Sequence, residues 1–313
     1  MICLRASAKL NLYLRVLGRR PDGYHEIETL FERIDLADEL AFEPHHSELV
    51  LNCADPTLSC GDDNLVMKAA RLLQSVSGTT RGARIHLTKR IPIAAGLGGG
   101  SSDAAAALRG LNELWRLQLG HQQLLELAAQ LGSDVPFFLS EAVRAVGRGR
   151  GEVCEPLPPT APLAYVLVVP DERLSTKAVY EAARLDPSTG AQGRIPSGVE
   201  GFDLTAPKPS ITMILHALSN GSPGELAKGL WNDLEPEAIR RCPVIALIQS
   251  HLRAEGCLGV CLSGSGPSVF GLCTDRSHAQ EVAAAMRTRA ARSWRIEVVR
   301  TDQSAPVVIS AVP

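Results

Sequence analysis

Residues 92–103 read Pro-Ile-Ala-Ala-Gly-Leu-Gly-Gly-Gly-Ser-Ser-Asp and run directly into an alanine-rich stretch. Glycine lets the main chain adopt positive φ angles and approach a ligand with no Cβ in the way. The amide groups of such a loop can converge on an anion, and the positive end of a helix dipole adds to the attraction. A flexible turn before a helix is the alternative, but such a turn rarely needs three adjacent glycines followed by two hydroxyl residues. The stretch therefore predicts a phosphate-binding loop.

The residues that flank this loop exclude two common phosphate-binding motifs. No Gly-Lys-Ser or Gly-Lys-Thr closes the loop, so it is not the P-loop of nucleoside triphosphatases. It also lacks the preceding buried parallel strand and the ribose-binding acidic residue of a dinucleotide fold. Ser101 and Ser102 could donate hydrogen bonds to phosphate, or one hydroxyl could reach a metal ion held by the phosphate. We expect Ser102 or Asp103 to cap the helix that follows.

Two distant segments support an anion site. Lys9 and Asn11 are two residues apart in an apolar stretch that alternates like a half-buried strand, so both would face the same side. A buried ammonium is costly without an anionic partner. The segment 263–268, Ser-Gly-Ser-Gly-Pro-Ser, lies between two apolar runs and predicts a second close approach of main chain. Taken alone, a surface lysine and a β-turn would explain these two features.

Composition limits the class of protein. Over 313 residues, 32 basic and 34 acidic side chains give a net charge of −2, which disfavours a scaffold that binds nucleic acid or an anionic membrane. No apolar run approaches the ~18 residues of a membrane span, and the N-terminus has no charged-then-apolar leader. The eight cysteines form no CxxC pair, which disfavours a zinc site and indicates buried thiols in a reducing cytoplasm.

The pattern of strands and helices predicts two α+β domains with a cleft between them. Period-two or apolar runs predict strands at 10–14, 27–36, 83–87, 164–169, 260–263, 269–272 and 296–299. Helices are expected after an Asp62-Asp63 cap and at 102–115, 122–131, 211–218, 244–254 and 279–289. The Gly/Arg run 147–151 and the prolines up to 162 predict the seam between the domains, and 185–209 predicts a long loop.

Three stretches together resemble the motifs of the GHMP small-molecule kinases, in the same order and at similar separation. They are Ala8-Lys-Leu-Asn-Leu-Tyr-Leu14, the glycine loop and the 263–268 segment. Further stretches resemble the branch of this family that acts on a CDP-linked methylerythritol: Gly18-Arg-Arg-Pro-Asp-Gly-Tyr-His-Glu26, Leu131-Gly-Ser-Asp-Val-Pro-Phe-Phe138 and Trp231-Asn-Asp-Leu-Glu-Pro236. The resemblance implies a ribosomal-S5-like nucleotide domain over residues 1–160, a ferredoxin-like domain over 161–313, and an active site between them.

The resemblance also implies an activity and the residues that carry it. ATP, with Mg²⁺, would phosphorylate the 2-hydroxyl of the methylerythritol portion. Asp134 would be the catalytic carboxylate, with Lys9 beside it. The implied substrate-binding residues are Asn11, Tyr24, His25, Thr176 and Tyr180. The implied ATP-binding residues are Asn64, Lys89, Pro92, Ala94, Ala95, Gly96, Leu97, Gly98, Gly99, Gly100, Ser101, Ser102 and Asp103, with Ser101 a candidate metal ligand. Ser263, Gly264, Ser265 and Gly266 would form a structural glycine motif near the site.

Several alternatives stay open at this point. Asp134 could instead cap a short helix that begins at Val135, because a proline follows in its first turn. Tyr180 could belong to the apolar face of an amphipathic helix. The chain could phosphorylate another small alcohol, such as homoserine or mevalonate, or could bind ATP as a non-catalytic sensor. We expect small-molecule partners only, in a monomer or a weak homodimer.

Overall fold

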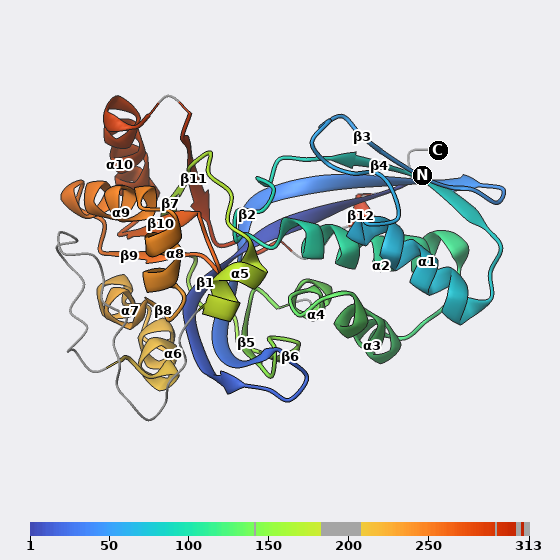
Figure 1. Cartoon of the computed structure of the whole chain (residues 1–313), viewed down its shortest axis with the longest axis horizontal. Coiled ribbons are helices and arrows are strands. Elements are labelled where there is room, and N and C mark those ends of the chain that lie inside the picture. Colours follow the sequence, from blue (N-terminus) through green and yellow to red (C-terminus); the bar gives the residue numbers. More distant parts are fainter. Residues whose placement is uncertain (141, 183–207, 292, 305–307, 310–313) are drawn as a thin grey trace.

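In a computed structural model of the chain, two β-sheets lie side by side, each covered by helices (Figure 1). The structure describes all residues except 141, 183–207, 292, 305–307 and 310–313. The long loop predicted at 185–209 therefore falls almost entirely outside the described residues. The two-domain α+β architecture is confirmed.

The first sheet is built around two long antiparallel strands, β1 (Ile2–Arg19) and β2 (His25–His45). Its other strands are β3 (Leu49–Cys53), β4 (Gly82–Thr88), β5 (Arg144–Arg148), β6 (Val153–Pro156), β8 (Trp231–Asn232) and β12 (Val308–Ile309). The main strand order is β12-β1-β2-β4-β3, while β5 pairs with the first part of β2 and with β6. The turn between β1 and β2 carries the stretch 20–24, so it projects beyond the sheet.

Four helices cover one face of this sheet. They are α1 (Leu65–Ser77), α2 (Gly99–Trp115), α3 (His121–Leu131) and α4 (Val135–Leu139). Their apolar sides form one core with side chains of β1, β2 and β4 that include Leu4, Phe42 and Ile85, all at most 3 % exposed. The alanine-rich sequence of α2 lets this helix lie close to the strands: a Cβ at Gly110 would meet the Phe42 ring at 2.5 Å. The second half of α2 is thereby held against β2.

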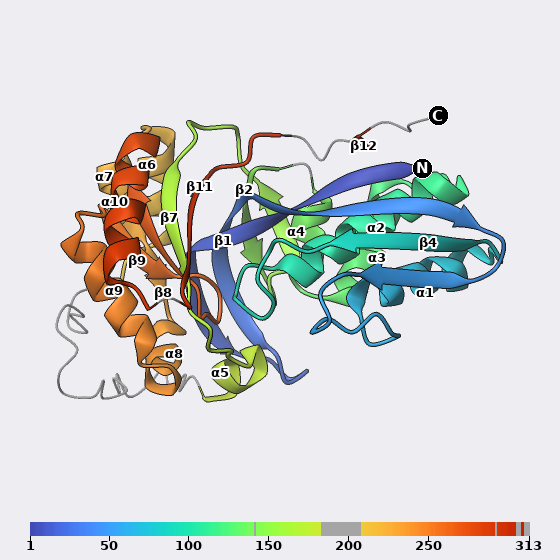
Figure 2. The ribbon, with the colours of Figure 1, turned by 90° about the horizontal axis from the view of Figure 1, so that it is seen from above.

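The second sheet has the strand order β11-β7-β10-β9 and is antiparallel throughout. Its strands are β7 (Ala164–Val169), β9 (Gly259–Leu262), β10 (Val269–Cys273) and β11 (Arg295–Arg300). The helices of this half are α5 (Thr176–Ala182), α6 (Ile211–Ser219), α7 (Pro223–Gly229), α8 (Glu235–Arg241), α9 (Val244–Ala254) and α10 (Arg276–Arg289). Figure 2 shows α9 and α10 on the outer side of this sheet and β1 on the side toward the first domain.

Strand β7 is buried on both faces, and its two faces have different neighbours. Val166 and Val168 pack with α8, α9 and α10, whereas Tyr165 and Leu167 pack with Leu10 of β1 and other residues at the domain junction. Alternate side chains of a strand point to opposite faces. A single six-residue strand therefore joins the core of the second domain to the first.

A buried polar network also joins the two domains. Glu32 of β2 accepts hydrogen bonds from Arg144 Nε at 2.6 Å, from the Tyr165 hydroxyl at 3.0 Å and from Thr301 Oγ1 at 2.6 Å. All four side chains lie at 3 % exposure or less. A buried carboxylate with this many donors is fully compensated, so the network fixes how the sheets meet.

The structure corrects several expectations from the sequence. The stretch 10–14 is not half-buried: its five residues are at most 2 % exposed, because Leu10 and Leu12 pack against the second domain, while Asn11 lies on the side of the interdomain cavity. Helix α1 is capped by Asn64 rather than by Asp62 or Asp63, since the Asn64 side chain accepts from the Val66 amide at 2.9 Å.

Two further boundaries differ. Helix α2 begins three to four residues before the predicted caps Ser102 and Asp103, at Gly99, and its cap is Gly98 in the left-handed region. The Gly/Arg run 147–151 forms the end of β5 and the turn of the β5–β6 hairpin within the first sheet, so the seam between the domains lies later, across the prolines that precede β7. Glycine-rich stretches mark both a hairpin and a linker, and the sequence pattern does not separate them.

Among the residues that the structure describes, no helix is long and apolar enough to cross a membrane. All eight cysteines are free thiols.

Candidate active site

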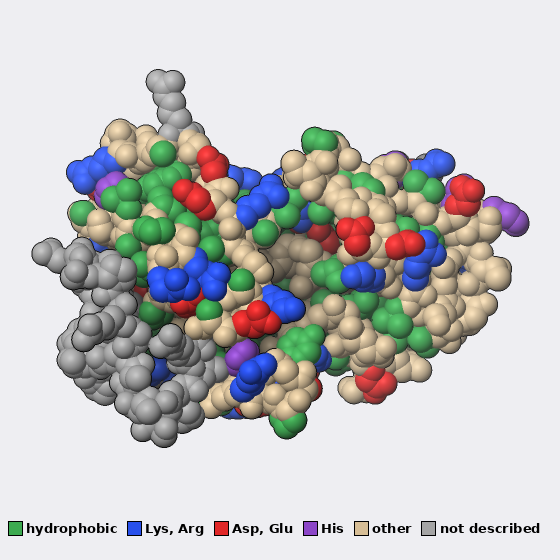
Figure 3. All heavy atoms as spheres, in the orientation of Figure 1, with side chains coloured by type: hydrophobic (Ala, Val, Ile, Leu, Met, Phe, Trp, Pro, Cys, Tyr) green, Lys and Arg blue, Asp and Glu red, His purple; other side chains and the backbone are tan. Residues whose placement is uncertain are grey.

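A large cavity opens between the two domains, where the surface is hollowed in Figure 3. Its volume is about 1190 Å³. Its walls come from β1, the β1–β2 turn, the glycine loop, the start of α2, the start of α4, helix α5 and the 263–268 segment. Segments from both halves of the chain therefore share one hollow.

The glycine loop forms one wall of the cavity. Ala94, Gly96 and Gly98 have φ angles of 56°, 77° and 70°. A left-handed conformation is costly for most residues, so the glycines at 96 and 98 are required by the main-chain path. A Cβ at Gly96 would meet the Ser263 carbonyl oxygen at 2.2 Å, and a Cβ at Gly98 would meet the Phe138 ring at 2.8 Å. The loop is thus packed against the second domain on one side and α4 on the other.

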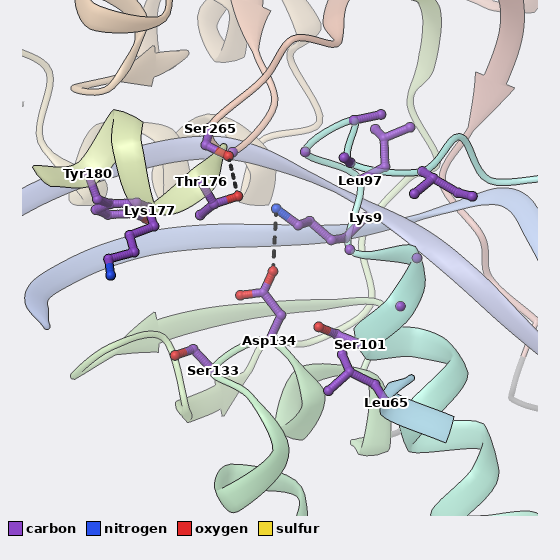
Figure 4. A pocket seen from close by; sticks show the side chains of 18 of the residues that line it. Lys9, Leu65, Leu97, Ser101, Ser133, Asp134, Thr176, Lys177, Tyr180 and Ser265 are labelled. Carbon is purple, nitrogen blue, oxygen red and sulfur yellow. Dashed lines mark hydrogen bonds and ion pairs between the residues drawn. The ribbon is translucent and has the colours of Figure 1, made fainter. Parts of the chain in front are cut away.

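Its two serines differ in position. Ser101 lines the cavity, and Figure 4 shows its hydroxyl on the side of Asp134. Ser102 is 3 % exposed and lines a separate small cavity with Ser7 and Phe138. In a helix, successive residues point about 100° apart, which turns Ser102 away once α2 begins at Gly99. The expectation that both hydroxyls reach one phosphate is therefore wrong for Ser102.

Lys9 and Asp134 meet in the cavity although they are far apart in sequence (Figure 4). Lys9 Nζ lies 3.6 Å from Asp134 Oδ2, and Lys9 also donates a hydrogen bond to Asn11 Oδ1. The Asn11 amide in turn donates to Thr29 Oγ1 at 2.8 Å, which fixes its orientation. The Lys9 side chain is 5 % exposed and that of Asp134 is 30 % exposed. The carboxylate is thus the more accessible partner.

Burial lowers the pKa of Lys9, and the nearby Asp134 carboxylate opposes this shift. Asp134 occupies the cap position of α4, yet its side chain makes no capping hydrogen bond. The alternative role as a helix cap therefore describes its main chain only. The carboxylate is left to face Lys9 and the cavity.

Aromatic side chains gather at the opposite end of the cavity. The rings of His25 and Tyr180 lie 5.5 Å apart, and the Arg150 guanidinium lies 4.7 Å from the centre of the Tyr24 ring. Tyr24 is 54 % exposed, so it does not fill a core. Tyr180 of α5 is half-buried and lines the cavity. It is therefore not simply part of the apolar face of an amphipathic helix.

Both titratable rings remain neutral near pH 7. Burial and the nearby Arg19 charge lower the pKa of His25 below its ordinary 6.5. Burial, with the Asp134 charge, raises the pKa of the Tyr180 hydroxyl. Thr176, at the start of α5, hydrogen-bonds Ser265 at 2.8 Å and so connects α5 to the second glycine segment.

Lys89 and Asp103 line the cavity below the glycine loop. Lys89 Nζ contacts the carboxylates of Asp38 and of Asp103, the latter at 2.8 Å. Burial would lower the pKa of Lys89, but the two carboxylates outweigh this effect and raise it. Burial raises the pKa of Asp103 to about 7, against the opposing effect of Lys89. Asn64, the α1 cap, also lines the cavity.

Most of the predicted site residues line this one cavity, and three do not. The exceptions are Ser102, Ser263 and Gly266. Ser263 contributes instead through its carbonyl and through its hydroxyl, which donates to the Gly96 carbonyl at 3.0 Å. The sequence reasoning missed Arg150 and Asp38. The arginine in the Gly/Arg run 147–151 was a usable signal, but this run was interpreted as a linker.

The chain is similar to known proteins over almost its whole length. The family model of the GHMP kinases N terminal domain matches residues 64–142, and that of the GHMP kinases C terminal domain matches residues 214–292. A 4-diphosphocytidyl-2-C-methyl-D-erythritol kinase of Pelotomaculum thermopropionicum is 44% identical over 290 residues, covering 92% of this chain and 94% of that protein. One of Gloeobacter violaceus is 40% identical, covering 90% and 89%.

Solved structures give the same relationship. The crystal structure of a 4-(cytidine 5'-diphospho)-2C-methyl-D-erythritol kinase superposes with a TM-score of 0.74 at 38% identity, covering 95% of this chain and 98% of the other. A homoserine kinase from Cytophaga hutchinsonii superposes with a TM-score of 0.71 at 19% identity, covering 96% and 94%, which shows a shared fold only. The chain is an enzyme of the GHMP kinase superfamily and belongs, within it, to the family of the 4-diphosphocytidyl-2-C-methyl-D-erythritol kinases.

Proposed function

We propose that the chain transfers the γ-phosphoryl group of ATP to the 2-hydroxyl of 4-diphosphocytidyl-2-C-methyl-D-erythritol, giving the 2-phosphate and ADP. This is a step in making isoprenoid precursors by the non-mevalonate route. The observation that carries the proposal is the Lys9–Asp134 pair, whose charged atoms lie 3.6 Å apart. The pair shares one cavity with the glycine loop and with the rings of Tyr24, His25 and Tyr180. The Pelotomaculum thermopropionicum relative, a 4-diphosphocytidyl-2-C-methyl-D-erythritol kinase at 44% identity, supports it.

The glycine loop would hold the triphosphate. Phosphoryl transfer asks a protein mainly for alignment and for stabilisation of charge on the transferred group. The main-chain amides between Gly96 and Ser101, at the N-terminal end of α2, suit phosphate oxygens. A helix of 17 residues supplies a full dipole at this point.

Asp134 and Lys9 would act on the acceptor. The 2-hydroxyl oxygen attacks the γ-phosphorus, the bond from that phosphorus to the bridging oxygen of ADP breaks, and Asp134 takes the hydroxyl proton. Such proton acceptance contributes typically ~10²–10⁴-fold to the rate. The Lys9 ammonium would stabilise negative charge on the attacking and transferred oxygens. Asn11, oriented by Thr29, would hold the acceptor's hydroxyls.

The far end of the cavity suits cytosine. Tyr24, His25 and Tyr180 present ring faces and polar edges, and base–aromatic stacking contributes ~1–3 kcal/mol per base. The neutral His25 can donate one ring hydrogen and accept at the other nitrogen, as a pyrimidine edge requires. Another small alcohol, such as homoserine, would leave this group of side chains without a partner.

Magnesium would enter with ATP. Among the described residues, no group of three or more His, Cys, Asp or Glu side chains could hold a metal ion. The residues around the glycine loop therefore fit an ion that is held chiefly by phosphate oxygens and water. The Ser101 hydroxyl would be the ligand from the chain. Bound there, the ion would neutralise charge on the β- and γ-phosphates.

A substrate panel tests the proposal. The enzyme is incubated with Mg²⁺ and ATP and with the CDP-linked alcohol, methylerythritol phosphate without the cytidine group, homoserine or mevalonate. We expect phosphate transfer only to the first, with ³¹P and ¹³C NMR placing the new phosphate on the 2-oxygen. Transfer to homoserine or mevalonate instead would overturn the substrate, and ATP binding without transfer to any acceptor would favour a sensor.

A further inference from the structure

Three charged side chains from separate elements meet where the chain enters and leaves the glycine loop. Lys89, just after β4, contacts Asp38 of β2 and Asp103 of α2. The side chains of Lys89, Asp38 and Asp103 are 7 %, 0 % and 4 % exposed. We call these three residues the loop anchor. Buried charges are stable where they are paired, and Lys89 pairs with Asp38 and with Oδ2 of Asp103, while Oδ1 of Asp103 makes no hydrogen bond to a described residue.

The loop anchor fixes the chain that leads into the glycine loop. Asp38 Oδ1 accepts hydrogen bonds from the main-chain amides of Arg90 at 2.5 Å and Ile91 at 2.8 Å. Its other oxygen contacts Lys89. Asp38 therefore binds three consecutive residues immediately before Pro92.

The same group also fixes the chain that leaves the loop. Asp103 lies in the second turn of α2, and its Oδ2 accepts from Lys89 at 2.8 Å. Lys89 Nζ would lie 3.3 Å from a Cβ at Gly99, so the ammonium packs against the first residue of the helix. Both ends of the loop 92–98 are thus attached to one ammonium.

The intervening loop needs such support. It holds Ala94, Gly96 and Gly98 at positive φ, and the alanine has no conformational preference for that region. Lys89 and Lys9 differ in their ion pairs. Lys89 contacts two buried carboxylates, whereas Lys9 lies 3.6 Å from the carboxylate of Asp134, which is 30 % exposed. For Lys89 to bind a phosphate, its ammonium would have to leave the two carboxylates that it contacts.

We propose that Lys89 is a positioning residue and not a phosphate ligand: held between Asp38 and Asp103, it fixes both ends of the glycine loop so that ATP meets a preformed set of amides. This inference rests on the proposed function of the loop. It changes the role that the sequence resemblance implies for Lys89 and Asp103, from contact with the nucleotide to support of its binding loop.

Two substitutions at one position separate support from direct contact. Asp103→Asn removes the charge but keeps the shape and an oxygen that accepts from Lys89, whereas Asp103→Leu removes the charge and the hydrogen bond. ATP affinity is measured by isothermal titration calorimetry with a non-hydrolysable ATP analogue. We expect the Leu variant to bind the analogue about tenfold or more weakly than the Asn variant, because a hydrogen bond to a charged group is lost.

The opposite role gives the opposite sign. If Lys89 were a phosphate ligand, removing a carboxylate that competes for it would free the ammonium, and Asp103→Leu would bind at least as tightly as Asp103→Asn. That result would overturn the proposal. The affinity for the CDP-linked substrate serves as an internal control, since the loop anchor does not contact the aromatic end of the cavity, and we expect it to change less than twofold.

A double variant keeps the test decisive if Asp103→Leu folds poorly. In Lys89→Met with Asp103→Leu, the ammonium and one of its carboxylates leave together. For a support role the loss of ATP affinity in the double variant is no larger than in Lys89→Met alone, because both substitutions break one unit. A larger loss of ATP affinity in the double variant than in Lys89→Met alone would overturn the proposal, and this comparison does not use the Asp103→Leu single variant. Wild-type enzyme that binds no ATP would instead contradict the function proposed for the loop, so the two failures are distinguishable.

Discussion

The Lys9 ammonium lies 3.6 Å from the Asp134 carboxylate, at the point where the centre of β1 passes the first residue before α4. Lys9 donates to Asn11, and Asp134 makes no capping hydrogen bond and is 30 % exposed, so the carboxylate is the more accessible member of the pair. A base with a fixed cation beside it is suited to accept a proton from an alcohol while negative charge develops on oxygen.

We therefore expect Asp134→Asn to lower kcat by roughly 10²–10⁴-fold, since the amide cannot accept the proton. ATP affinity should stay within about twofold, because the glycine loop is untouched. Ser133→Ala, at the adjacent cavity residue, is the matched control and should keep most of the activity. Steady-state kinetics and calorimetry measure both quantities, and a wild-type kcat for Asp134→Asn would remove this residue from the mechanism.

The lowered pKa of Lys9 predicts a pH dependence. A lysine is charged below its pKa, so a pKa below the ordinary 10.5 places the loss of the ammonium at a lower pH than for an exposed lysine. We expect kcat/KM, which reports the free enzyme, to fall on the alkaline side with a midpoint below 10.5.

The control for this pH profile is Lys9→Arg, because arginine does not lose its proton in this range. Its residual activity should lack that alkaline decline. A decline at the same midpoint in the arginine variant would assign the titration to another group.

Tyr24 offers a test of the cytosine site that spares the core. It is 54 % exposed and carries the Arg150 guanidinium over its ring. Tyr24→Ala should weaken binding of the CDP-linked substrate by ~1–3 kcal/mol, with ATP affinity unchanged. Tyr24→Phe keeps the ring and should retain most of the affinity. Calorimetric titration of both variants with the CDP-linked substrate checks this, and equal affinities for wild type and Tyr24→Ala would place cytosine elsewhere.

Gly96 lies in the glycine loop and Gly100, four residues later, in the first turn of α2, and the two glycines differ in their neighbours. A Cβ at Gly96 would meet the Ser263 carbonyl oxygen at 2.2 Å, at a φ of 77°, whereas at Gly100 the nearest atom would be Leu65 Cδ1 at 3.7 Å. We expect Gly96→Ala to destabilise the fold by about 1–3 kcal/mol and to weaken ATP binding, because the loop must leave its strained path. The unfolding free energy of Gly100→Ala should lie within about 0.5 kcal/mol of the wild-type value.

Thermal unfolding with and without an ATP analogue reports both effects. Gly100→Ala also separates folding from binding, since any loss of ATP affinity in a normally stable protein comes from the ligand side of the loop. Normal stability and normal ATP affinity in Gly96→Ala would contradict the close packing of the two glycine segments.

Two arginines of β5 provide a comparison between a buried and an exposed ion pair. Arg144 is 2 % exposed and contacts Glu32 at 2.6 Å, whereas the Arg148 side chain is 49 % exposed and contacts Glu155 at 2.9 Å. Arg144→Ala leaves a buried carboxylate without its cation, so we expect a loss of about 3–5 kcal/mol in unfolding free energy. Arg148→Ala should cost about 0–1 kcal/mol. Chemical denaturation measures both, and equal losses would contradict the role of Arg144 at the domain junction.

The sequence alone predicted the class of fold and the chemistry of the loop. Apolar periodicity located β7, β10, α9 and most other long elements, because the spacing of apolar residues shows which positions of a strand or helix are buried. The residues of the glycine loop indicated an anion site for a local reason: consecutive glycines matter only where the main chain itself must approach a ligand or a neighbour. Short elements such as α7 and α8 were missed, since one or two turns carry little periodic signal.

Tertiary structure decided what the local pattern leaves open. It brought Asp134 to Lys9, set Gly96 against Ser263, and placed Arg150 over Tyr24, all of them contacts between residues distant in sequence. It also turned Ser102 away from the cavity, because the start of α2 at Gly99 fixes the direction of every later side chain. Strand and helix periods say which face a residue occupies, but only the packing of the two domains says what that face meets.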